Sequence, residues 1–253
     1  MTNNTMSTQI QTWIAGLDDP DRTVRQRAAM ALGTAGEAAA AEALVARLGT
    51  ETDCFVREAL TWATVQAGPE AVPGVLEQLG SPTPAVRMQA AHVLSKIGDP
   101  DHAGVLAGVV ADPDPEVAVK AYRAAANTQA VSVVPALAGR LGHGDLEQRD
   151  ALNAAFVTLG EKSLDALVAA LGDADASVRE HAADALGSLG SPLADPAVDP
   201  LRALLGDVDA DVRFAAVTAL GELDPESAEQ AIADAAGSTD TRVSAVAQRL
   251  QAR

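Results

Sequence analysis

The stretch Asp175-Ala-Ser-Val-Arg-Glu-His-Ala-Ala-Asp-Ala-Leu-Gly-Ser-Leu-Gly190 decides the fold of this chain. Small and aliphatic residues recur three, six or seven, and ten places after Arg179, and this spacing places them in one stripe along an amphipathic helix. Asp175 has the position and chemistry of an N-cap, because its carboxylate can accept a first-turn backbone N–H. Gly190 follows the last residue of the stripe and is typical of the position that ends a helix at its C-terminus. The stretch therefore predicts one complete helix with its start and stop signals.

The same pattern returns along the whole chain, and its Val-Arg pair recurs at intervals of about 31 residues. The pairs are Val24-Arg25, Val56-Arg57, Val86-Arg87, Val178-Arg179 and Val212-Arg213, with the divergent forms Val117-Ala118, Gln148-Arg149 and Thr241-Arg242. The matching N-cap candidates are Asp21, Asp53, Asp114, Asp145, Asp175 and Asp209, and the matching stops are Gly36, Gly68, Gly98, Gly160 and Gly190. The repeat predicts one structural unit used eight times.

A second helix follows the first in each unit. Leu164, Leu167 and Leu171 have helical spacing and precede Gly172, and equivalent residues recur in other units. Residues 8–17 read as an unpaired second helix and residues 240–252 as an unpaired first helix. Since one helix pair cannot bury its apolar stripe alone, the units must stack into a continuous core. We expect a disordered tail over residues 1–7 and a single all-α domain over residues 8–253.

The stretch from Asp175 to Gly190 resembles the short HEAT-like repeat of the phycobilisome lyases. The resemblance covers residues 8–252 and implies an armadillo-like α-α superhelix, a solenoid of about eight helix pairs. It also implies a polar ladder of Asp and Arg between stacked units, which Ala118 interrupts in unit four, so we expect a weaker joint there. Proteins with this repeat include bilin lyases, enzyme-associated subunits and adaptors, so the resemblance does not assign an activity.

The chain is acidic, with 35 Asp and Glu against 18 Lys and Arg and a net charge of −17. Helix capping accounts for only part of this excess. The charge disfavours nucleic acid and anionic membranes as partners and favours a basic protein or peptide. One cysteine, Cys54, excludes an internal disulfide, and no secretory signal or membrane span is recognisable. We expect a cytoplasmic monomer; whether Met1 or Met6 is the true start stays open.

No motif predicts a catalytic residue, a cofactor or a metal. His92, Asp99, Asp101 and His102 could meet around one inter-helix turn, but two solvated histidines beside a capped turn are the stronger interpretation. His143 is expected in a turn and His181 on the outer side of a first helix. Cys54, directly after a helix N-cap, is interpreted as an ordinary half-buried small residue rather than a reactive thiol.

The candidate partner-binding residues belong to the first helices of units one to four. Aromatic, methionine and arginine side chains concentrate binding energy, and only six residues of the chain are aromatic. Trp62 falls in one repeat position with Met30, His92 and Arg123, while Met88 lies one helical turn from His92. The predicted patch is Met30, Phe55, Trp62, Met88, His92 and Arg123. The alternative is that Trp62 only covers a seam between units.

A competing acidic face lies on the second helices. Its exposed positions carry small residues together with Glu42, Glu70, Glu77 and Asp101, so a basic helix or extended peptide could approach closely. The sequence thus predicts a non-catalytic scaffold or adaptor that presents a long preformed surface to another protein. Two alternatives stay open: a chromophore- or cofactor-handling lyase or chaperone of the bilin-lyase type, and an acidic binder of a basic protein.

Overall fold

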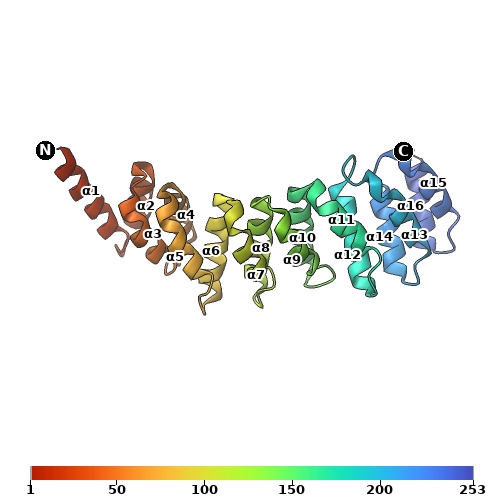
Figure 1. The fold of residues 1–253 in the computed structure, drawn as a ribbon, viewed down its shortest axis with the longest axis horizontal. Coiled ribbons are helices and arrows are strands. Elements are labelled where there is room, and N and C mark those ends of the chain that lie inside the picture. The colour runs from red at the N-terminus through yellow and green to blue at the C-terminus, as the bar shows by residue number, and fades with distance from the viewer. Residues whose placement is uncertain (1, 253) are drawn as a thin grey trace.

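The computed structural model describes residues 2–252, with the side chains of residues 8–252. These residues form sixteen α-helices and no strand, which confirms the predicted all-α solenoid. The helices follow one another as an elongated array of pairs from the N-terminus to the C-terminus (Figure 1). The tail predicted over residues 1–7 lies outside the residues whose side chains are described and stays a prediction. No described helix is both long and apolar enough to cross a bilayer.

The helices fall into two sets that alternate along the chain. The first helices are α2 (Arg22–Ala35), α4 (Cys54–Gln66), α6 (Pro84–Ile97), α8 (Pro115–Asn127), α10 (Leu146–Leu159), α12 (Ala176–Leu189), α14 (Ala210–Leu220) and α16 (Thr241–Gln251). The second helices are α1 (Thr2–Gly16), α3 (Ala41–Leu48), α5 (Val72–Gln78), α7 (Ala103–Val109), α9 (Val134–Ala138), α11 (Glu161–Ala170), α13 (Val198–Ala203) and α15 (Pro225–Ala236). Short 3₁₀ turns adjoin several of them: η1 (Ala38–Ala40), η2 (Gly68–Ala71), η3 (Pro100–His102), η4 (Val131–Val133), η5 (Asp195–Ala197) and η6 (Leu204–Gly206).

First helices pack largely against the first helices of neighbouring units, whereas most second helices contact both the following first helix and other second helices. First helices contact first helices, as α2 with α4, α6 with α8 and α12 with α14, and second helices contact second helices, as α7 with α9 and α13 with α15. The result is two layers, with seven complete pairs and one single helix at each end. One cluster of buried apolar residues runs from Ile10 to Ala231, and a small cluster around Val217 and Val243 closes the C-terminal end.

The predicted start signals are confirmed. In each of the six units the aspartate carboxylate accepts a hydrogen bond from a backbone N–H in the first turn, which satisfies a donor that the helix cannot pair. These caps are Asp21, Asp53, Asp114, Asp145, Asp175 and Asp209. The five predicted glycines follow the ends of first helices at φ values between 60° and 80°, where a side chain would be strained.

The register of the last unit differs from the prediction. Asp240 is the N-cap of α16, and its side chain accepts from the backbone N–H of Arg242. Counting from this cap, Val243 and Ser244 occupy the positions of Val212 and Arg213 in the preceding unit. The predicted pair Thr241-Arg242 therefore lies two residues too early. The cap, rather than the Val-Arg likeness, marks the repeat.

The expected polar ladder exists and joins consecutive first helices. An arginine of one unit forms paired hydrogen bonds with a carboxylate in the loop before the next first helix. In the clearest case, Arg87 Nε and Nη2 donate to the two oxygens of Asp112 over 2.8 Å each. One of these oxygens, Oδ1, also accepts from the backbone N–H of Asp114, 2.9 Å away, so one carboxylate fixes both its own loop and the preceding unit. Equivalent pairs are Arg25–Glu51, Arg179–Asp207 and Arg213–Asp240.

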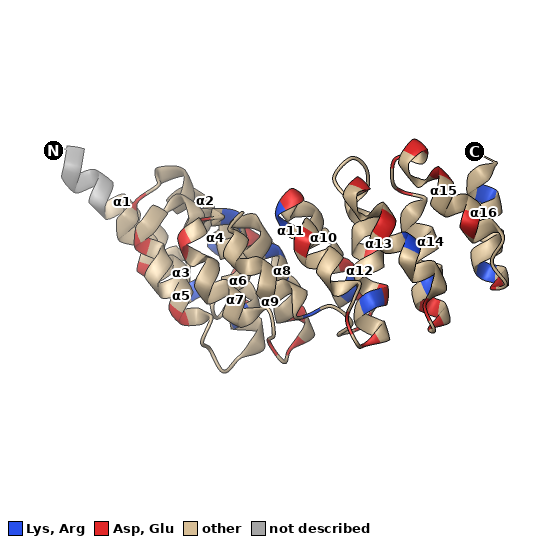
Figure 2. Ribbon diagram, turned by 45° about the vertical axis from the view of Figure 1, so that its right-hand side comes forward, with Lys and Arg blue, Asp and Glu red and all other residues tan. Residues whose placement is uncertain are grey.

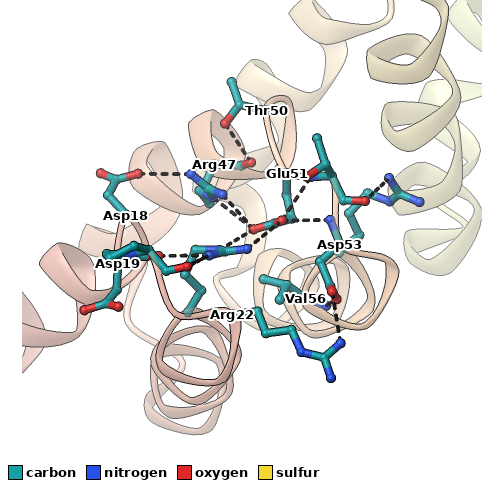
Figure 3. Close-up of polar contacts among 12 residues, drawn as sticks. Asp18, Asp19, Arg22, Arg47, Thr50, Glu51, Asp53 and Val56 are labelled. Atoms are coloured by element: carbon teal, nitrogen blue, oxygen red, sulfur yellow. Dashed lines mark hydrogen bonds and ion pairs between the residues drawn. The ribbon is translucent and has the colours of Figure 1, made fainter.

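Glu51 is the most enclosed member of this ladder, and its side chain has no solvent exposure. Arg25 Nε and Arg47 Nη2 each lie 2.8 Å from its Oε2. The backbone N–H groups of Thr52 and Asp53 donate to Oε1 (Figure 3). Burial raises the pKa of Glu51, but the hydrogen bonds from Arg25, Asp53 and Arg47 outweigh it and lower the pKa to about 2. The carboxylate is therefore charged and fully satisfied in the fold.

The ladder is interrupted in the middle of the array, as Ala118 predicts. Among the described residues, no ion pair crosses the joint between unit four and unit five. The joint between unit two and unit three is crossed only by the contact of Glu58 with the mainly neutral His92. At the joint between unit five and unit six Arg149 does not face Asp173. Instead its Nη2 lies 3.2 Å from Glu180 and 3.5 Å from Asp184 on α12. Burial and the neighbouring Glu180 raise the pKa of Asp184 to about 6.

His181 is buried, which corrects the prediction that it lies on the outer side of its helix. Its Nδ1 accepts from the backbone N–H of Gly142 at 3.1 Å, and its Nε2 lies 3.3 Å from the carbonyl oxygen of Arg149. Both contacts are satisfied by the neutral ring with the proton on Nε2. Burial, followed by the charge of Arg149, lowers the pKa of His181 to about 4. The helical spacing alone could not reveal that a loop of another unit covers this position.

Replacing Glu51 with glutamine leaves Arg25 and Arg47 facing an uncharged amide in a buried site. We expect the free energy of unfolding to fall by about 3 kcal/mol, as when one partner of a buried ion pair is removed. Urea unfolding followed by far-UV circular dichroism measures the change. The control is Asp18→Asn, because the Asp18 side chain is 82% exposed and should contribute less than about 1 kcal/mol. Equal losses in the two variants would contradict the account.

His181 makes stability depend on pH. Its pKa is 6.5 when unfolded and about 4 when folded, so the unfolded chain binds more protons between these values and stability falls as the pH falls through this window. The variant His181→Asn keeps an acceptor for Gly142 but does not titrate. Between pH 6.5 and pH 4 we expect the wild type to lose on the order of 3 kcal/mol more than this variant. Urea titrations at both pH values measure the free energy of unfolding. An equal loss in the wild type and in His181→Asn would refute the prediction.

Candidate functional site

The two helix layers differ in charge. The second helices and their 3₁₀ turns carry many carboxylates, whereas most of the described bases lie on first helices (Figure 2). The second helices hold three bases, and each already has a partner. Arg47 pairs with Glu51, Arg202 pairs with Asp234, and Lys162 donates to Gln129. The acidic excess of the second-helix layer is therefore not neutralised within the described part of the chain.

Three of the four predicted acidic residues converge on one groove of this layer. Glu42 on α3, Glu70 on η2 and Glu77 on α5 are exposed and line a groove of about 690 Å³. No Lys or Arg lines it. Asp101 lies on η3 outside the groove, where its backbone N–H donates to Asp99. We call the hollow formed by α3, η2 and α5 the acidic groove.

The floor of the acidic groove is small and apolar. Val45 packs so close to Gly74 that an added Cβ at Gly74 would lie 3.1 Å from it. Gln78 Nε2 donates to the carbonyl oxygen of Val45 at 2.7 Å and ties α5 to α3. Pro82 and Val86, from the loop before α6 and from α6 itself, complete the lining. The groove combines carboxylates with a close-packed apolar floor.

Members of the predicted first-helix patch line two different hollows. Met88 and His92 line one hollow of about 360 Å³ together with Cys54, across α4, α6 and α8. Arg123 lines the adjoining hollow of about 390 Å³ between α8 and α10. Lys120 lines both. Sequence reasoning missed Lys120, although its position three residues before Arg123 on one helix places the two on one face.

The remaining members of that patch lie near units one and two and line neither hollow. Phe55 is 64% exposed, Met30 46% and Trp62 38%. The Trp62 ring rests on Gly33 of α2, where even a Cβ would collide with it. This contact supports the alternative in which Trp62 covers the seam between two units, while its outer face stays exposed.

His92 is the one histidine of these hollows. Its Nε2 lies 3.3 Å from Glu58 Oε1, but neither ring nitrogen makes a well-formed hydrogen bond to a described residue. Burial lowers the pKa of His92, the charge of Glu58 opposes this, and Lys120 and Lys96 add to the lowering. The ring is therefore mainly neutral near pH 7.

Metal ligation at the His92 turn finds no support in the described part of the chain. No group of three or more His, Cys, Asp or Glu residues there could hold a metal ion. Asp99 instead caps η3. His102 is buried within η3, which corrects the expectation that both histidines beside this turn are solvated. His143 lies in the loop before α10, as predicted. Cys54 is exposed rather than half-buried.

Comparison with solved structures places the fold among known solenoids. A crystal structure of importin beta in an ammonium sulfate condition matches with a TM-score of 0.59 and 15% identity, covering 98% of this chain and 40% of that one. This chain therefore spans less than half of that protein. Human deoxyhypusine hydroxylase in complex with glycerol matches with a TM-score of 0.46 and 20% identity, over 99% and 97% of the two chains.

A third structure, the complex of CpcE and CpcF of phycocyanin lyase from Nostoc sp. PCC7120, matches with a TM-score of 0.45 and 23% identity, over 95% and 94% of the chains. The last two alignments are too loose to carry an argument about this chain. No curated protein sequence matches it significantly. The model of HEAT repeats matches residues 4–65, 63–117 and 164–251. Because these segments cover most of the chain, and the stacked helix pairs agree with them, the chain belongs to the HEAT repeat family.

Proposed function

We propose that this protein is a non-catalytic interaction scaffold and that its acidic groove binds a basic segment of another protein. The observation that carries the proposal is the groove itself, with Glu42, Glu70 and Glu77 around it and no base among its lining residues. A carboxylate-lined hollow without internal counter-charge attracts Lys and Arg. HEAT repeats in general mediate contacts between proteins, which agrees with this use.

The floor of the groove suits the same ligand. Lys and Arg have long apolar stems that can lie along a hydrophobic surface while the charged heads reach polar groups. Val45, Ala46, Gly74 and Val86 offer such a surface, with little side-chain bulk to keep a peptide backbone away. Because the two helices are fixed by stacking, the groove exists before the ligand arrives, and this lowers the ordering cost of binding.

Long-range charge supports the same partner. The net charge of −17 accelerates the approach of a basic protein and makes the encounter sensitive to salt. In this proposal the protein acts in the cytoplasm as a monomer, and it uses neither a cofactor nor a nucleic acid.

A second candidate function comes from the first-helix hollow. Cys54 and His92 line it together with Met88, and a lyase or chaperone of the bilin-lyase type would need side chains of this kind beside its chromophore. Visible absorbance of the purified protein, together with labelling of Cys54, tests this alternative. A colourless protein whose Cys54 reacts only at the rate of a free thiol would exclude it.

The test of the groove uses a fluorescein-labelled peptide of alternating lysine and alanine as the probe. Replacing Glu42, Glu70 and Glu77 by glutamine should weaken binding about tenfold, since three exposed charge pairs at roughly 0.5 kcal/mol each correspond to that factor. Fluorescence anisotropy at constant ionic strength measures the affinity.

A matched control removes three carboxylates from other second helices. Glu161, Asp165 and Glu229 are exposed and make no ion pair with a described residue, and their replacement by Gln, Asn and Gln changes the net charge equally. We expect this variant to bind nearly as well as the wild type. If both variants weaken binding alike, the peptide senses only the net charge and the groove is not the site.

A further inference from the structure

The hollow between α8 and α10 has the opposite charge from the rest of this acidic protein. It measures about 390 Å³ and is lined by Val119, Lys120, Arg123 and Asn127 of α8 and by Ala151, Ala154, Ala155 and Thr158 of α10. No Asp or Glu lines it. In a chain with 35 carboxylates and 18 bases, a hollow with two cations and no carboxylate is unusual. We call it the basic hollow.

Its two cations are unused within the described part of the chain. Neither Lys120 nor Arg123 makes an ion pair with a described residue, whereas Arg87 and Arg149, on the helices to either side, are both held by carboxylates. Arg123 is exposed and Lys120 half-buried. A guanidinium that has no partner in the fold presents its five donors to whatever enters the hollow.

The surroundings of the two cations are apolar and close-fitting. Val119, Ala151 and Ala155 form small walls between the helices. The Asn127 side-chain amide donates to Ser95 and is thereby fixed at the rim, and the Thr158 hydroxyl bonds back to Ala154. The hollow therefore suits a side chain or segment with an apolar body and a carboxylate tip.

The carboxylates next to the basic hollow limit which kind of anion can bind there. The adjoining hollow, which shares Val119 and Lys120, also carries Glu58, Glu116 and Glu147. A polyanion such as nucleic acid needs an array of bases and would meet these carboxylates within a few residues of Arg123. A short segment with one or two carboxylates and small apolar residues would not.

We infer that the basic hollow is a docking site for an acidic, partly apolar segment of a partner protein. The site lies in the layer of first helices, whereas the acidic groove lies in the layer of second helices, so the scaffold carries two docking surfaces of opposite charge. One chain can then hold a basic segment and an acidic segment at the same time. The basic hollow would bind its segment through Lys120 and Arg123, whether or not the acidic groove holds a basic segment.

The test uses the full chain and a fluorescein-labelled peptide of alternating glutamate and alanine. The double variant Lys120→Gln with Arg123→Gln should weaken binding about fivefold or more. The matched control, Arg27→Gln with Arg249→Gln, removes two exposed first-helix bases that have no ion-pair partner among the described residues, and it should bind as the wild type does. Circular dichroism confirms that both variants fold.

A second variant tests the hollow without removing its bases. Ala154 is exposed on the α10 side, so Ala154→Glu places a carboxylate beside the two cations and should compete with the peptide to a similar degree. The inference requires that both hollow variants weaken binding while the control does not. It is overturned if the wild type does not bind the peptide, if either hollow variant binds normally, or if the control loses as much. The variant that lacks Glu42, Glu70 and Glu77 should keep its affinity for this peptide, which separates failure of the groove from failure of the hollow.

Discussion

The stacking of this solenoid depends on one polar interaction, the pair between an arginine of one first helix and the carboxylate before the next. Alanine-rich helices approach closely but offer few large side chains to fix their register. The carboxylate of Asp112, for example, receives Arg87 from the preceding unit and the backbone N–H of Asp114 from its own. Each such group ties the preceding first helix to the loop that leads into the next one. Because the partly buried pairs are fully hydrogen-bonded, they specify how units join as well as adding stability.

This arrangement also explains how an acidic protein comes to have surfaces of different charge. The ladder uses the arginines of the first-helix layer, and the aspartate caps belong to the same loops. The carboxylates of the second helices take no part in it, so Glu42, Glu70 and Glu77 remain available around the groove. Where the ladder is interrupted, at Ala118, the nearby cations Lys120 and Arg123 have no assigned partner. Ala118, where the ladder is interrupted, and the two cations of the basic hollow thus lie on the same helix, α8.

The sequence predicted the parts of the structure that depend on local chemistry. Aspartate caps, glycine stops and helical spacing indicated the solenoid, and Ala118 located one interruption of the ladder. Prediction from the sequence failed where the position of a side chain depends on how neighbouring units pack against each other. His181 is covered by the loop at Gly142, and no spacing within its own helix could show this. Asp101 separates from Glu42, Glu70 and Glu77 because it lies on η3, which does not line the groove. Likewise Lys120 joined the candidate residues only once α8 and α10 were seen to enclose a hollow.

The central claim is that ion pairs between units hold the array together, so that the joint between unit four and unit five, which none crosses, is weaker than the joint between unit one and unit two. Native-state hydrogen exchange, followed by mass spectrometry of peptides from each first helix, measures this most directly. The account predicts lower protection for the amides of α8 and α10 facing that joint than for those of α2 and α4, where Glu51 is held by two arginines. Uniform protection along the array, or a maximum at α8 and α10, would contradict it.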